Sequence, residues 1–164
     1  MDFSDVASLE DHGFVGLWQI DELMLRPKLI PMEQGVYFVV PPDSYTPDFL
    51  SIGTGGFFKG RDPNVPIDVL RSRWVEGAAV LNIGKAGGLS NMSTLRRRIG
   101  DYLKFGRGRA IAHWGGRYIW QLRDTSLLRV CWKVTDEDPR TVEKALIARF
   151  KSQFGANPFA NIQS

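Results

Sequence analysis

The chain has 164 residues, 43% of them hydrophobic and 24% charged, which predicts one soluble globular domain over residues 1–164. No apolar stretch approaches the length of a membrane span, and the acidic start of the chain is unlike a signal peptide. We therefore expect a cytoplasmic protein. The single cysteine, Cys131, excludes an internal disulfide and a multi-cysteine zinc site, and its place in an apolar run predicts a buried strand residue.

Charge is distributed unevenly along the chain. Residues 1–50 contain nine acids and two bases, a net charge of −7, whereas residues 85–133 contain eleven bases and two acids, a net charge of +9. A basic block inside a folded domain is typical of a nucleic-acid-binding surface. A solvated surface balanced by the acidic N-terminal part explains the pattern equally well.

Short apolar runs predict five strands. The runs are rich in branched and aromatic residues, and several are bounded by proline or glycine. The first lies in an acidic N-terminal extension (residues 1–30) and leads into a helical turn, and the last two are expected to pair with each other. In chain order the predicted strands cover residues 17–20, 34–40, 78–84, 117–122 and 128–134.

Helical spacing and capping residues predict three further helices. The first covers 66–74 and follows a glycine-rich loop. A serine or threonine can cap the second, and an aspartate followed by proline opens the third. The second helix runs from Ser93 or Thr94 to about Lys104, and the third from Asp138-Pro139 to near Phe154-Gly155.

Three consecutive arginines follow the start of the second helix. At about 100° per residue, Arg98 lies at the edge of the apolar face, Arg97 points the opposite way and Arg96 lies beside the face. Arg98 is therefore best placed to reach the sheet, where a guanidinium can make paired hydrogen bonds to a phosphate. Alternatively, its stem covers the core and its head reaches solvent.

Glu143 interrupts an apolar stripe of the last helix, which continues through Ile147, Phe150 and Phe154. A buried carboxylate is costly unless it is paired or binds a metal, and its oxygens suit Mg²⁺. A glutamate in the first turns of a helix is also stabilised by the helix dipole. The pattern supports both interpretations.

From Gly35 to Asn161 the chain resembles the GIY-YIG nuclease superfamily. Gly35-Val36-Tyr37 is similar to the first signature tripeptide, and Asn82-Ile83-Gly84 takes the place of the second, followed by Lys85-Ala86. By resemblance, Arg98 aligns with the catalytic arginine, Glu143 with the metal-binding glutamate, and Asn161 with an asparagine that supports the site.

The resemblance implies an α/β (α+β) fold, with a small central antiparallel β-sheet flanked by helices. It also implies a divalent-metal-dependent endonuclease that hydrolyses DNA with Mg²⁺ or Mn²⁺. Glu143 would hold the metal, Arg98 would stabilise charge on the phosphate, and a tyrosine would take the proton from water. The expected catalytic residues are Tyr37, Asn82, Lys85, Arg98 and Glu143, supported by Gly35, Gly84 and Asn161, with DNA contacts from Arg96, Arg97, Lys104, Arg107 and Arg109.

Two features depart from the family pattern. Asn82 stands where the second signature begins with tyrosine, and an asparagine cannot accept a proton from water. Either Tyr37 carries the base role or activity is lowered or lost, which leaves a nucleic-acid-binding or protein-interaction module as the alternative. The 44 residues between Tyr37 and Asn82 indicate an insertion, residues 41–77, near the site.

His113 has no metal-ligand spacing to His12. A structural or surface histidine is expected there, and a site residue brought in by a loop is the alternative. Trp114 and Trp120 are expected in the core. A single active site that cuts both DNA strands needs either two copies of the chain or two successive visits, so a homodimer is one expectation.

Overall fold

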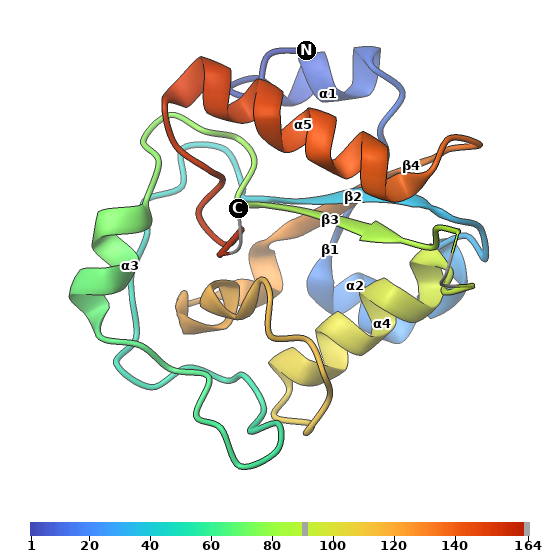
Figure 1. The fold of residues 1–164 in the computed structure, drawn as a ribbon. Helices are drawn as coiled ribbons and strands as arrows, with labels where there is room; N and C mark the ends of the chain where they lie inside the picture. Colours follow the sequence, from blue (N-terminus) through green and yellow to red (C-terminus); the bar gives the residue numbers. More distant parts are fainter. Residues whose placement is uncertain (90–91, 163–164) are drawn as a thin grey trace.

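A four-stranded antiparallel sheet forms the centre of the protein, in a computed structural model that describes residues 1–89 and 92–162. The strand order is β1-β4-β2-β3, so β2 and β4 are interior and β3 is an edge. Helices α1 and α5 cover one face, and α2 and α4 lie on the other (Figure 1). The predicted class, a small antiparallel sheet flanked by helices, is confirmed. The strands are β1 (Val15–Gln19), β2 (Gly35–Val40), β3 (Asn82–Ala86) and β4 (Arg129–Val134).

The helices alternate with these strands along the chain. Thr94 caps α4 by accepting a hydrogen bond from Arg97 N, and Asp138 caps α5 by accepting from Arg140 N, as their residue types predict. The α-helices are α1 (Val6–Asp11), α2 (Ile20–Leu25), α3 (Ile67–Arg73), α4 (Leu95–Gly106) and α5 (Pro139–Phe154), and the 3₁₀ helices are η1 (Pro27–Leu29), η2 (Arg117–Gln121) and η3 (Thr125–Leu127).

Strand β2 contributes side chains to both hydrophobic cores, one on each face of the sheet. Because side chains alternate along a strand, Val36 and Phe38 pack in the cluster that includes Phe150 of α5, whereas Tyr37 and Val39 pack in the cluster that includes residues of α2 and α4. All six residues of β2 are buried. A strand covered on both faces produces the continuous apolar run seen in the sequence.

The acidic N-terminal residues 1–30 contribute the strand β1 to this sheet. Strand β1 pairs with β4, and the ring of Phe14 stacks on Phe38 with 4.0 Å between ring centroids. The acids of this segment lie at the surface, whereas several of its apolar residues, such as Phe3, Leu9 and Leu23, are buried in the cores. No helix in the described ranges is long and apolar enough to cross a membrane.

The prediction of a strand at 117–122, paired with 128–134, is wrong. Most of that segment is the 3₁₀ helix η2, which begins after Gly116 at a left-handed φ of 90°. Strand β4 already pairs with β1 on one side and β2 on the other, so it has no free edge for a further strand. The apolar residues of η2, such as Ile119 and Trp120, are buried in the α4-side core instead.

Replacing Gly35 with alanine is expected to lower the free energy of unfolding by about 1–3 kcal/mol. A Cβ at this position would overlap the main-chain carbonyl of Lys133 and lie 3.0 Å from Leu95 Cδ1. Gly100→Ala within α4 is the matched control, because a Cβ there would meet no described atom within 4 Å apart from its own helix backbone and chain neighbours. Alanine also stabilises a helix interior by about 0.5–1 kcal/mol relative to glycine. Urea denaturation measures both; a Gly35→Ala protein as stable as the parent would contradict the prediction.

Candidate active site

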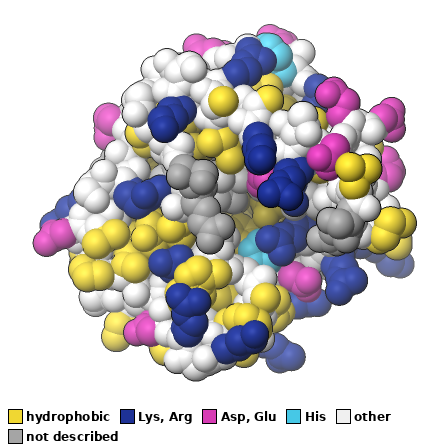
Figure 2. All heavy atoms as spheres, viewed as in Figure 1, with side chains coloured by type: hydrophobic (Ala, Val, Ile, Leu, Met, Phe, Trp, Pro, Cys, Tyr) yellow, Lys and Arg dark blue, Asp and Glu magenta, His cyan; other side chains and the backbone are white. Residues whose placement is uncertain are grey.

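A cleft of about 790 Å³ runs along the edge strand β3, between α4 and α5. Figure 2 views this side of the molecule and shows Lys and Arg side chains around its central hollow. Segments far apart in the chain meet here. Side chains that line the cleft include Tyr37, Asn82, Lys85, Arg98, His113, Asp138, Glu143 and Asn161.

The phenol of Tyr37 lies across the main chain of Gly84, its partner in the β2–β3 ladder. A Cβ at Gly84 would overlap the Tyr37 ring, so only glycine admits the phenol here. Burial raises the pKa of Tyr37 to about 12, an effect opposed by the charge of Arg98 and a hydrogen bond with it, and reinforced by Glu143. The hydroxyl therefore keeps its proton at neutral pH.

Of the three consecutive arginines, Arg98 lines the cleft, as the helical spacing predicts. Arg97 is exposed. Arg96 turns away and donates hydrogen bonds to the carbonyls of Ile30 (2.7 Å) and Lys28 (3.3 Å), so its guanidinium holds the chain that precedes β2.

Glu143 faces the cleft from the second turn of α5 and is half-buried. Burial raises its pKa, and the nearby cations Lys85 and Arg98, followed by two on α5 itself, act in the opposite direction. None of the ion pairs between described residues includes Glu143. The carboxylate is thus close to several positive charges without being neutralised by direct contact with one.

Asn82 is only 5% exposed, and a glycine turn closes over it. A Cβ at Gly116 would lie 3.4 Å from Asn82 Oδ1, and the hydroxyl of Tyr102 donates to the Gly116 carbonyl at 3.0 Å. A longer side chain at position 82 would therefore have to enter the cleft or displace this turn.

His113, expected to be a structural or surface histidine, lines the cleft as well. Its Nε2 lies 3.2 Å from the Arg98 carbonyl; since a carbonyl only accepts, Nε2 carries the proton. Nδ1 has no partner within the described structure. Burial, with a smaller effect from Arg98, lowers the pKa of His113 to about 3, so the ring is neutral. No sequence spacing links His113 to the site, because a loop brings it there.

Asn161 closes the outer edge of β3. Its side chain accepts from Ile83 N and donates to the Ile83 carbonyl, both at 2.8 Å, and Ala160 N donates to the Leu81 carbonyl at 2.8 Å. These bonds use main-chain groups that an edge strand otherwise leaves unpaired. Residues 157–162, which we call the closing segment, thereby fix the position of one wall of the cleft.

Of the two predicted supporting glycines, Gly84 lines the cleft, whereas Gly35 is buried where β2 approaches β4. Of the three bases predicted near the end of α4, Lys104 lies 3.9 Å from Asp101, whereas Arg107 and Arg109 are simply exposed.

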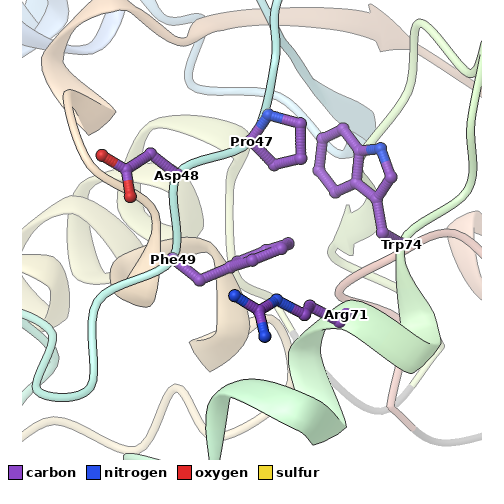
Figure 3. A pocket seen from close by; sticks show the side chains of 5 residues that line it. All are labelled: Pro47, Asp48, Phe49, Arg71 and Trp74. Atoms are coloured by element: carbon purple, nitrogen blue, oxygen red, sulfur yellow. The ribbon is translucent and has the colours of Figure 1, made fainter.

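A second hollow, of about 340 Å³, lies on the inserted segment (Figure 3). Pro47, Phe49 and Trp74 line it together with Asp48 and Arg71. The carboxylate of Asp48 points away from the hollow (Figure 3) and forms an ion pair with Arg123. Trp74 packs against Phe49 and Phe159, with ring centroids 6.0 and 5.3 Å apart. This aromatic contact ties residues 41–77 to the closing segment that carries Asn161.

No protein-family profile matches this chain, and no curated protein or solved structure matches it significantly.

Asn161→Ala is expected to lower the free energy of unfolding by about 1–3 kcal/mol, the sum of two ordinary hydrogen bonds. Asn157→Ala is the matched control, because Asn157 is a half-buried asparagine of the same segment for which the structure shows no side-chain hydrogen bond. Hydrogen exchange of the Ile83 amide provides a second readout. Unchanged exchange in Asn161→Ala would show that the side chain does not hold β3.

Proposed function

We propose that this protein is a divalent-metal-dependent endonuclease of GIY-YIG type that hydrolyses DNA phosphodiester bonds. The observation that carries the proposal is that Arg98, Glu143 and Tyr37, three residues singled out from separate parts of the sequence, line one cleft. A guanidinium, a carboxylate and a phenol around one hollow can bind a phosphate, a cation and a water molecule.

Glu143 is the residue proposed to hold Mg²⁺ or Mn²⁺. No group of three or more His, Cys, Asp or Glu side chains in the described part of the chain could form a complete metal cage. Magnesium commonly binds through one or two carboxylates, with waters and substrate phosphates as its other ligands, and an unpaired carboxylate in a cationic cleft fits that arrangement. When bound, the metal would polarise the scissile phosphate.

Arg98 and Lys85 are proposed to bind the phosphate. Both lie close enough to Glu143 to affect its pKa, and a guanidinium can donate two parallel hydrogen bonds to phosphate oxygens. The α5 cations Arg140 and Lys144 also line the cleft. These four cations outnumber the two acids of the cleft, Glu143 and Asp138. The resulting net positive charge would favour an anionic substrate.

Tyr37 is proposed to accept the proton of the attacking water. The phenol must first lose its own proton, which its high pKa opposes and the adjacent Arg98 favours. Asn82 can orient the water by hydrogen bonding but cannot take its proton. His113 is the second candidate base, because its neutral ring leaves Nδ1 without a partner among the described residues.

Asn82 also favours a second candidate function, a module that binds nucleic acid or protein without cleavage. Cleavage by Asn82→Tyr, with none by the parent chain, would support this alternative and reject the first.

Glu143→Gln and Arg98→Gln are each expected to reduce DNA cleavage by about 10²–10³-fold, the usual loss when a group that stabilises transition-state charge is removed. Arg149→Gln, which removes a positive charge from an exposed position of α5 about 180° around the helix from the cleft-lining side, should cleave at nearly the parent rate. The assay is plasmid cleavage in Mg²⁺ or Mn²⁺, with melting curves for every variant.

Loss of activity in Glu143→Gln should not reflect unfolding. The raised pKa of Glu143 means that the fold disfavours its charged form, so ionised Glu143 lowers stability at neutral pH and this effect disappears as the pH falls through the raised pKa. Glu143→Gln should therefore be at least as stable as the parent. Cleavage at the parent rate by this variant would reject the nuclease assignment of Glu143.

The pH profile of cleavage distinguishes the two candidate bases. If Tyr37 acts, its pKa of about 12 predicts a rate that rises about tenfold per pH unit between about pH 7 and pH 9, because the phenolate fraction does so. Tyr37→Phe should abolish this dependence together with most activity. A flat profile, with activity retained in Tyr37→Phe and lost in His113→Ala, would instead assign the role to His113, which is already neutral over this range.

A further inference from the structure

Beside the cleft, guanidinium groups alternate with aromatic rings. Arg61 lies 4.5 Å from the centroid of the Trp114 ring and Arg117 lies 4.4 Å from the same ring. Arg117 is also 5.0 Å from the Tyr118 ring, and Arg73 is 5.8 Å from it. We call Arg61, Trp114, Arg117, Tyr118 and Arg73 the arginine–aromatic row.

The row begins at the rim of the cleft. Trp114 stands in the chain between His113 and Gly115, which both line the cleft. At the other end, Arg73 donates a hydrogen bond of 2.8 Å to the carbonyl of Asn161, another lining residue. A ligand that leaves the cleft on this side would meet the row directly.

The row holds positive charge that no acid in the described structure neutralises. Burial lowers the pKa of Arg117, the charge of Tyr118 opposes this effect, and Arg61 and Arg73 each lower the pKa further. None of the ion pairs between described residues includes these three arginines. The Nε of Arg117 is buried without a hydrogen-bond acceptor. Gathering like charges in this way is unfavourable for the fold alone, which points to an anionic ligand.

Packing does not by itself explain the row. Arg73 has a structural task, because it binds carbonyls of the closing segment. Arg61 is exposed, and the Trp114 ring is the contact that the structure shows for its guanidinium. An exposed cation–π contact is worth only about 0.5–1 kcal/mol, whereas a guanidinium lying over a ring keeps its N–H edge available for phosphate oxygens.

We propose that the arginine–aromatic row binds backbone phosphates of a DNA duplex outside the cleft, an inference that rests on the proposed nuclease function. Arg61 and Arg73 come from residues 41–77, so the insertion supplies a substrate track that the two signature strands lack. Because two guanidiniums contact the Trp114 ring, the ring orients cations instead of stacking on bases. The contact is to phosphates and is independent of base sequence.

The test measures DNA binding separately from cleavage. In the Glu143→Gln protein, Arg61→Gln is compared with Arg149→Gln, which removes the same charge from an exposed position of α5 about 180° around the helix from the cleft-lining side. Binding of labelled duplexes of several sequences is followed by fluorescence anisotropy over a range of KCl concentrations. Melting curves verify that each variant is folded.

Arg61→Gln should weaken binding by about two- to fivefold, the effect of one exposed charge contact, equally for all sequences. It should also lower the slope of log affinity against log salt concentration by about one. Arg61→Lys should retain the slope and Arg149→Gln should leave both quantities nearly unchanged.

If Arg61→Gln and Arg149→Gln weakened DNA binding equally, the proposal that the row binds phosphates would be overturned, and the nuclease proposal would remain intact. A loss confined to particular sequences would overturn phosphate recognition in favour of base recognition, and absence of DNA binding by Glu143→Gln would overturn the row outright. The nuclease proposal itself is decided separately, by plasmid cleavage with the parent chain.

Discussion

The buried phenol of Tyr37, packed over the bare main chain of Gly84, sets the geometry of the cleft. Because position 84 has no side chain, an interior strand can extend a hydroxyl under the edge strand without forcing the two apart. Arg98 of α4 lines the same cleft and lies close enough to that hydroxyl to lower its pKa. The sheet and the helix thus face each other at the point where the proposed chemistry takes place.

Charged side chains of opposite sign lie close together in the cleft without forming ion pairs between described residues. Glu143 is influenced by Lys85 and Arg98, yet no ion pair between described residues neutralises it. A closed ion pair would satisfy both partners and leave nothing for a ligand. Open charges of opposite sign favour binding of a cation and a phosphate together, at the expense of stability in the free protein.

The inserted segment 41–77 and the closing segment act together on β3. Trp74 packs against Phe159, and Arg73 donates a hydrogen bond to the Asn161 carbonyl. Asn161 in turn forms hydrogen bonds with the outer edge of β3. The insertion therefore supports β3, one wall of the cleft, indirectly through the closing segment. The insertion also carries Arg61 beside the cleft. It therefore provides both the support of the wall and the proposed contact with DNA.

The sequence by itself determined the elements governed by neighbouring residues: the caps of α4 and α5, the buried β2, and the directions of Arg98 and Glu143 on their helices. These follow from periodicity and local hydrogen bonding, which act over a few positions. Tertiary structure alone decided that residues 117–122 form a 3₁₀ helix, that His113 enters the cleft and that Trp114 lies against two arginines instead of in the core. Each of these depends on contacts between segments that are distant in the chain. Strand β4 had no free edge for residues 117–122, and His113 and Trp114 lie on a loop whose neighbours come from separate parts of the chain. No local sequence pattern encodes such long-range contacts.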